Sequence, residues 1–261
     1  MDSKPRRLPY GPPANTSFKF KGCKEDQWEG IQAWNRVKSL CISKKEKIKY
    51  VRRMIMIARE RRKKMGILGE IANVDRKDIP QMLECLTDDL NRLKAEEEIS
   101  NFVFAGSYRR MSETVNDIDI IITTETHEYG WGPILNTISE SKCVKKIASI
   151  GTKKATIILD SGLQVDLLMA KPEEEGTMLL YFTGSPFFNI ALRARAKKMG
   201  LKLNERGLYD ETDRLVTRCN TETVILAELG LEYIPASERS VDHTDWSTAH
   251  KLFARHKLKK D

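Results

Sequence analysis

The spacing of hydrophobic and polar positions changes its period near residue 100. Before that point, apolar residues recur every three or four positions, which is typical of amphipathic helices. The first such stripe is formed by Ile48, Val51, Ile55 and Ala58, and the second by Leu83, Leu86, Leu90 and Leu93. The pattern predicts one helix that ends at Gly66 and another that begins near Pro80.

After residue 100 the apolar residues gather in short runs that predict strands. These runs span 102–105, 118–123, 156–159 and 163–169. The last two flank Asp160-Ser161-Gly162, which predicts a hairpin turn. Residues 178–200 become helical again, and a mixed segment follows as far as Pro235. The fold class expected from this order is α+β, with a mixed β-sheet at its centre.

Charge adds a possible partner to this picture. The 261 residues carry a formal net charge of +8, and basic residues dominate between 36 and 64 and again after residue 251. Two basic segments favour contact with duplex DNA at more than one place, although solvated helix faces would give the same pattern. Lys49, Arg52 and Arg53 are the predicted DNA contacts in the first segment.

The cysteines and the apolar runs bear on the compartment. The five cysteines are widely spaced and form no C-x-x-C pair, which favours a reduced intracellular protein. No apolar run approaches the roughly 20 residues of a membrane helix, and the N-terminus lacks an apolar signal region. We therefore expect an intracellular protein without a membrane partner, and a monomer.

An alternating stretch beginning at Asp117 carries the first candidate chemistry. In a strand, Asp117 and Asp119 share one face while Ile118, Ile120 and Ile122 share the other. Two carboxylates at this spacing, about 7 Å apart at Cα, repel each other unless a cation lies between them. Hard oxygen ligands suit Mg²⁺, but a lone D-x-D is also common on exposed strand edges.

The residues around this pair favour the metal-site interpretation. Eleven residues earlier, Gly106 and Ser107 follow a predicted strand, where a glycine lets the backbone approach a phosphate. Arg110 adds a cation suited to bidentate phosphate binding. Asp166 lies in a second predicted strand between Val165 and Leu167, and it faces the same surface if the two strands are neighbours. Three such aspartates can hold two metal ions about 3.5–4 Å apart, as in phosphoryl-transfer enzymes.

These blocks and several later ones resemble the family X DNA polymerases, of which polymerase beta is the best-known type. The resemblance covers residues 76 to 240 in order, and it includes compact viral members of the family. Its further blocks are Leu180–Ser185, Phe188–Asn189, Arg193–Ala194, Asn204–Glu205, Leu231–Pro235 and Glu238–Arg239.

The resemblance implies a role for each matching residue. Asp117 and Asp119 would bridge two Mg²⁺ ions, with Mn²⁺ as a substitute, and Asp166 would bind the catalytic ion beside the primer 3′-hydroxyl. The nucleotide-binding residues would be Gly106, Ser107, Arg110, Asn116, Tyr181, Phe182, Gly184 and Asn189. Arg193 would reach the template strand and, with Glu205, respond to closure of the nucleotide-binding subdomain. The family's unusual cis peptide would fall between Gly184 and Ser185.

The chain also departs from the family pattern. Asn116 replaces a glycine next to the aspartate pair, and Asp78 replaces an arginine of polymerase beta. Leu168 stands where that enzyme has a further arginine near the third aspartate, so a simple arginine–aspartate pair is not expected there. These changes bear on triphosphate affinity and fidelity.

Five regions are expected along the chain. They are a flexible leader (1–24), a helical DNA-binding region (25–100), a palm with the aspartates (101–171), a nucleotide-binding subdomain (172–240) and a basic C-terminal tail (241–261).

The predicted function is template-directed filling of short gaps in nicked or gapped duplex DNA from dNTPs. The alternatives are a template-independent terminal nucleotidyltransferase and a non-catalytic protein that binds DNA ends. The expected location is the nucleus or, for a viral protein, a cytoplasmic replication site or the virion.

Overall fold

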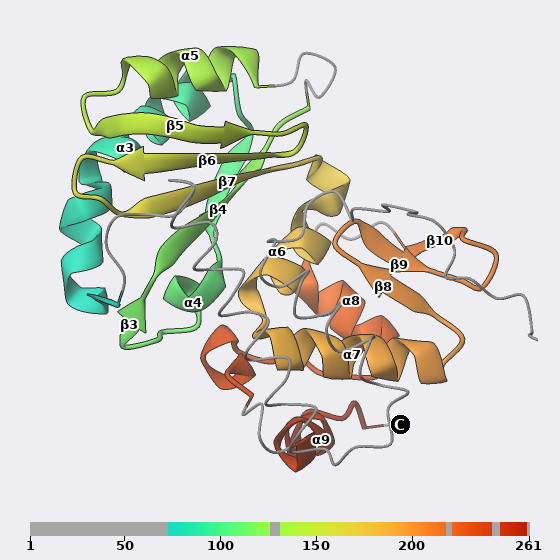
Figure 1. Cartoon of the computed structure of the whole chain (residues 1–261). Helices are drawn as coiled ribbons and strands as arrows, with labels where there is room; N and C mark the ends of the chain where they lie inside the picture. The colour runs from blue at the N-terminus through green and yellow to red at the C-terminus, as the bar shows by residue number, and fades with distance from the viewer. Residues whose placement is uncertain (1–72, 126–130, 218–220, 242–245, 260–261) are drawn as a thin grey trace, which may run out of the picture.

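The computed structural model describes residues 73–125, 131–217, 221–241 and 246–259 (Figure 1). The leader, most of the predicted DNA-binding region and the three basic residues assigned to it lie outside these ranges. Strand β1 (Val74–Asp75) and the short helix η1 (Arg76–Asp78) lead into α3 (Ile79–Ala95). Pro80 lies in the first turn of α3, and the predicted leucine stripe is buried, which confirms this helix.

A five-stranded mixed sheet forms the larger half of the molecule (Figure 1). Its order is β2-β4-β7-β6-β5, and only the central β4–β7 pair is parallel. The strands are β2 (Asn101–Phe104), β4 (Asp117–Thr123), β5 (Val144–Ile150), β6 (Lys154–Leu159) and β7 (Gln164–Ala170). A separate short strand, β3 (Thr114–Val115), pairs with β1. Strands β6 and β7 form the predicted hairpin.

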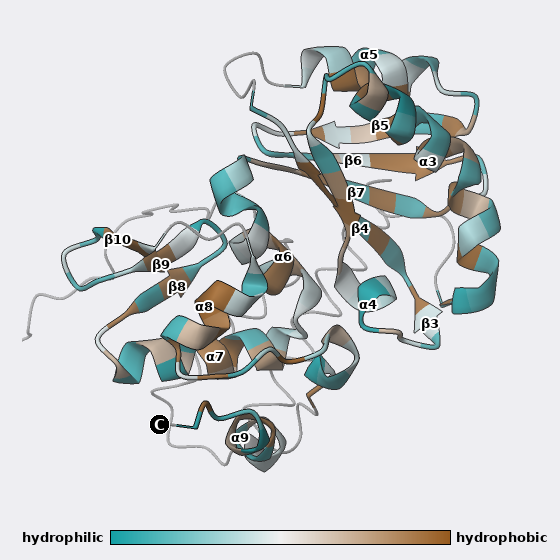
Figure 2. Ribbon diagram, turned by 180° about the vertical axis from the view of Figure 1, so that it is seen from behind, coloured by the Kyte–Doolittle hydropathy of each residue, from teal (hydrophilic) through white to brown (hydrophobic). Residues whose placement is uncertain are grey.

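Alternation along the central strands divides their side chains between two cores. Ile118, Ile120 and Ile122 of β4 pack with α3 and with α5 (Gly132–Glu140). Ile121 faces the other way and packs with α6 (Glu175–Thr183), which follows the short helix η3 (Pro172–Glu174). Figure 2 shows the hydrophobic colour that runs along the middle of this sheet. The face of the sheet shared with α6 is therefore the one on which Asp119 lies.

The smaller half contains its own core below α6 (Figure 1). This half of the molecule consists of α7 (Pro186–Lys198), a sheet of β8 (Lys202–Asn204), β9 (Gly207–Tyr209) and β10 (Leu215–Thr217), then α8 (Glu222–Glu228), η4 (Ala236–Arg239) and α9 (Trp246–Arg255). Residues 246–255, assigned to a basic tail, form a helix whose Leu252 and Phe253 belong to this core. The Phe253 ring lies edge-on to Phe188, with ring centroids 5.7 Å apart. The sequence pattern had not separated the three short strands.

Helices on a mixed sheet confirm the α+β class. Among the described residues, no helix combines the length and apolar character needed to cross a membrane.

Candidate active site

The parallel pairing of β4 with β7 brings two of the predicted aspartates directly together. Asp119 and Asp166 are register partners across this pair, and Asp117 lies opposite Gln164. Neighbouring strands lie about 4.8 Å apart, and register partners point to the same face of a sheet, so the two carboxylates lie side by side on one face. Asp119 is 2% exposed and Asp166 1%, whereas Asp117 is half-buried. The structure thus places the three carboxylates together, as the sequence predicted.

Asp166 is held by polar side chains from its own strand and from β6. Its Oδ1 accepts hydrogen bonds from Thr156 Oγ1 at 2.8 Å and Gln164 Nε2 at 3.1 Å, and its Oδ2 lies 3.1 Å from Lys154 Nζ. A cation therefore contacts the third aspartate even though Leu168 replaces the arginine of polymerase beta. Sequence reasoning missed Lys154, because only the β6–β7 register brings it there.

The Gly106 turn lies against the second aspartate. Gly106 has φ +64°, and a Cβ at this position would lie 2.1 Å from Asp119 Oδ2. The amide of Ala105 also donates to the Asp119 carbonyl at 2.8 Å. A glycine is required here for two reasons, the left-handed backbone and the space next to the carboxylate. Gly106 is also the first residue of the short helix α4 (Gly106–Arg109), where Ser107 is half-buried.

Arg110 follows this turn and faces the aspartates. Its Nη1 donates to the Thr183 carbonyl at 2.7 Å, while its Nε is buried without a hydrogen-bond partner among the described residues. Burial lowers the pKa of Arg110, and the charges of Asp119 and Asp117 oppose that change. A buried donor without an acceptor is costly, so this site suits an anionic oxygen.

Arg109 connects the two halves of the molecule, a role that sequence reasoning did not assign. Its Nη1 and Nη2 each lie 2.8 Å from a carboxylate oxygen of Glu222 at the start of α8. Arg239 Nη1 approaches the same carboxylate at 2.5 Å and is completely buried, and its guanidinium also donates to the Ile234 carbonyl. Burial by itself would raise the pKa of Glu222, but the hydrogen bonds from the two arginines outweigh it and lower that pKa. This network, which we call the Glu222 network, joins α4 to α8 and η4.

The predicted nucleotide-binding aromatics lie at the end of α6. The rings of Tyr181 and Phe182 are nearly perpendicular with centroids 5.3 Å apart, and both are buried. Asn189 Nδ2 donates to the Tyr181 carbonyl at 2.6 Å, and a Cβ on Gly184 would lie 2.5 Å from Asn189 Oδ1. Tyr181, Gly184 and Asn189 are therefore one packed unit. The peptide between Gly184 and Ser185 is trans, so the expected cis bond is not found there.

The contacts of the remaining predicted residues involve other parts of the described structure. Asn116 Oδ1 accepts from the Asn73 amide at 3.0 Å on an exposed part of the surface. Glu205 is buried, and this burial raises its pKa although Arg206 and Arg193 act in the opposite direction. Arg193 is half-buried on α7.

A pocket also borders the α4 turn, lined by residues that include Arg76, Lys77 and Tyr108. The Arg76 guanidinium lies 4.4 Å from the centroid of the Tyr108 ring and donates to the Tyr108 carbonyl. It therefore contacts the turn near the position where Asp78 replaces the arginine of polymerase beta.

Comparisons with known proteins agree with this arrangement. The sequence model of one protein family, the DNA polymerase beta thumb, matches residues 178–240. Repair DNA polymerase X of African swine fever virus (isolate Warthog/Namibia/Wart80/1980) is 30% identical over 136 residues, which cover 51% of this chain and 78% of the viral protein. The DNA polymerase/3′-5′ exonuclease PolX of Bacillus subtilis is 32% identical over 152 residues, 55% of this chain and 26% of that one. A DNA nucleotidylexotransferase of Eulemur macaco is 39% identical over 79 residues, 30% of this chain and 16% of its own.

The fold and these matches define a protein of the polymerase beta-like class. More narrowly, the chain belongs to family X of the DNA polymerases.

Proposed function

We propose that this protein is a template-directed DNA polymerase that fills short gaps during repair. It would add a dNMP to a primer 3′-hydroxyl and release pyrophosphate. The observation that carries the proposal is the pairing of Asp119 with Asp166 across β4 and β7, beside the Gly106 turn and Arg110. The name of the viral relative, a repair polymerase, supports the same reaction.

The carboxylates fit two Mg²⁺ ions, with Mn²⁺ as a substitute. The donors are hard oxygens on adjacent strands, and Gly106, which has no Cβ, leaves room for the Asp119 carboxylate. Asp117 and Asp119 would hold both ions and Asp166 the one nearer the primer. Bound there, the ions would stabilise charge on the attacking and leaving oxygens. Asp166, oriented by Thr156 and Gln164, would be placed to accept the proton of the primer hydroxyl.

The triphosphate would lie along the Gly106 turn. Ser107 would donate from its hydroxyl, and the buried Nε of Arg110 would gain the acceptor that it lacks among the described residues. Asn116 would lie at the edge of this phosphate site.

The sugar and the base would contact the end of α6. Tyr181 and Phe182 would pack under the sugar, next to Gly184, and Asn189 would donate to the minor-groove edge of the base. That last role requires Asn189 to exchange its bond with the Tyr181 carbonyl, or to use its second amide hydrogen.

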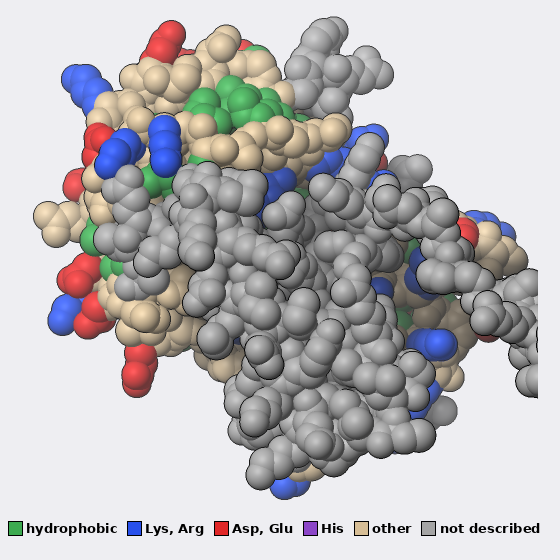
Figure 3. Space-filling view, viewed as in Figure 1, with side chains coloured by type: hydrophobic (Ala, Val, Ile, Leu, Met, Phe, Trp, Pro, Cys, Tyr) green, Lys and Arg blue, Asp and Glu red, His purple; other side chains and the backbone are tan. Residues whose placement is uncertain are grey.

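The subdomain division belongs to the same proposal. Residues 101–171 would form the palm and 172–240 the nucleotide-binding subdomain, with 25–100 as the DNA-binding region. Lysine and arginine side chains lie on both halves of the face in Figure 3, a distribution that suits a phosphate backbone. Arg193 and Glu205 would respond to closure, and Lys49, Arg52 and Arg53 would add phosphate contacts. We expect a monomer in an intracellular, reducing compartment.

A template-independent transferase is the second candidate, because a nucleotidylexotransferase is among the relatives. That match covers 30% of this chain, whereas the viral repair polymerase matches 51%. A protein that only binds DNA ends would not require three aspartates on one face.

The decisive experiment measures single-nucleotide incorporation into a one-nucleotide gapped duplex with Mg²⁺. Each dNTP is offered separately, with and without the template strand. We expect only the complementary dNTP to be added, and Asp119→Ala to slow addition by at least about a thousandfold, since metal-ion stabilisation contributes several kcal/mol. Asp213→Asn, a change on an exposed loop, is the control and should behave as wild type. Addition without regard to template would favour the second candidate, and no addition at all would contradict both.

A further inference from the structure

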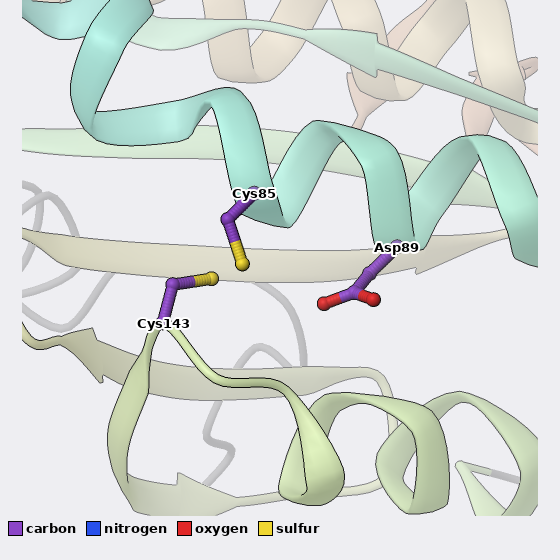
Figure 4. A group of neighbouring side chains, drawn as sticks. All are labelled: Cys85, Asp89 and Cys143. Atoms are coloured by element: carbon purple, nitrogen blue, oxygen red, sulfur yellow. The ribbon is translucent and has the colours of Figure 1, made fainter.

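Three potential metal ligands meet on the side of the palm where α3 and α5 lie, away from the aspartate face (Figure 4). Cys85 and Asp89 are one helical turn apart on α3, and Cys143 follows the end of α5. One ligand atom from each residue lies within 4.8 Å of the other two. Figure 4 shows the two sulfurs and the carboxylate directed toward a common space.

The polar contacts within this group leave one acceptor without a donor. Asp89 Oδ1 accepts from Arg92 at 3.0 Å, but its Oδ2 is buried and has no hydrogen-bond partner among the described residues. Ser141 Oγ lies 3.1 Å from Cys143 Sγ and 3.8 Å from Cys85 Sγ. Because a buried carboxylate oxygen without a donor is costly, the group is suited to a cation that this oxygen can bind.

We propose that Cys85, Asp89 and Cys143 form a binding site for a single Zn²⁺ ion. Two thiolate sulfurs and one carboxylate oxygen are ligands that Zn²⁺ takes in tetrahedral sites. The fourth position belongs to a water molecule, for which the Ser141 hydroxyl is a neighbouring hydrogen-bond partner. Soft sulfur ligands distinguish this site from the aspartates, whose hard oxygens select Mg²⁺ or Mn²⁺.

A disulfide is the competing use of the two thiols. The position of Asp89 favours a metal ion over a disulfide. Its carboxylate shares the space between the two sulfurs, and a disulfide would leave its buried Oδ2 without a partner among the described residues.

Zn²⁺ at this site would cross-link α3 to the segment that enters β5. These elements are distant in sequence, and both pack on the sheet that carries the aspartates on its other face. Binding to the folded state alone stabilises it by mass action, so saturating Zn²⁺ should raise the midpoint of thermal unfolding and a chelator should lower it.

The test uses Co²⁺ as a spectroscopic probe of the full chain under a phosphine reductant. Cys23, Cys41 and Cys219 are first replaced by serine, so that the only thiols left are those of the site. We expect a thiolate-to-metal charge-transfer band that saturates at one thiolate-bound Co²⁺ per chain and is lost when Zn²⁺ displaces that ion stoichiometrically. Cys85→Ser or Cys143→Ser should abolish the band, and Asp89→Asn should weaken binding by about tenfold or more. Asp119→Ala should leave the band unchanged, because oxygen ligands give no such transition.

Failure of the reduced chain to show the band would overturn the proposal. So would a band that persists in Cys143→Ser, or a Zn²⁺-dependent rise in the unfolding midpoint that is equal in Cys85→Ser. Rapid formation of a Cys85–Cys143 disulfide in air, together with no metal uptake after reduction, would assign the pair to redox chemistry instead.

Discussion

Replacing Glu222 by glutamine tests how strongly the two halves of this polymerase are joined. The carboxylate is 4% exposed and binds Arg109 through both of its oxygens, while Arg239 is completely buried beside it. Glutamine keeps the size of the side chain but removes the charge. Arg239 would then remain buried without a counter-ion from this position.

The expected loss of unfolding free energy is about 3–5 kcal/mol, the usual effect of breaking a buried ion pair by removing one partner. Asp213→Asn is the matched control, because it breaks the Lys202–Asp213 pair, whose side chains are 58% and 73% exposed. Water screens such a pair, so the control should lose only a small fraction of that amount.

Urea unfolding near neutral pH, and again under acid conditions, measures both effects. The pKa of Glu222 is lowered in the folded state, so its stabilisation is present above the unfolded value of 4.5 and is lost as pH falls through the folded value. Wild type and Glu222→Gln should therefore converge in stability in acid. If Glu222→Gln loses no more than Asp213→Asn near neutral pH, the network has no net stabilising effect and the reasoning is refuted.

Three further variants test the site and its surroundings. Gly106→Ala should slow nucleotide addition by about a hundredfold, because the new Cβ would displace the buried Asp119 carboxylate. Gly132→Ala is the control and should leave the rate unchanged, because a Cβ at that position meets nothing within 4 Å. Lys154→Met should lower the Mg²⁺ concentration for half-maximal rate by about fivefold, since Lys154 competes for Asp166; an unchanged Mg²⁺ titration would exclude that competition. Burial raises the pKa of Glu205 in the folded state, so wild type loses stability as pH rises. Glu205→Gln should therefore have a higher midpoint of thermal unfolding than wild type above pH 7, and the same midpoint near pH 4. A difference between the two midpoints that does not change with pH would contradict this cause.

Local patterns in the sequence predicted much of the fold and the centre of the site. The leucine stripe of α3 and the alternation around Asp119 are set by residues close in sequence, so their periods could be read directly. Asp166 was predicted to join the site on condition that its strand neighbours β4, and the parallel pairing confirms that condition.

Contacts between distant segments could not be predicted in the same way. Lys154 reaches Asp166 only through the β6–β7 register, and Arg109 meets Glu222 only after the two halves have packed. Likewise, the approach of Cys85 to Cys143 depends on how α3 and α5 lie on the sheet. In each case an ordinary-looking residue acquires its role from a partner far away along the chain.

The parallel pairing of β4 with β7 has a consequence for how this protein becomes active. A parallel pair requires a crossover connection, and here α5, β5 and β6 all lie in the chain between the two strands. Contacts of such long range form slowly, and a slip of one residue would turn each aspartate to the opposite face of the sheet. A chain in which β4 and β7 have not yet paired therefore lacks the aspartate arrangement of the candidate site, and the onset of nucleotide addition during refolding would report that this pairing is complete.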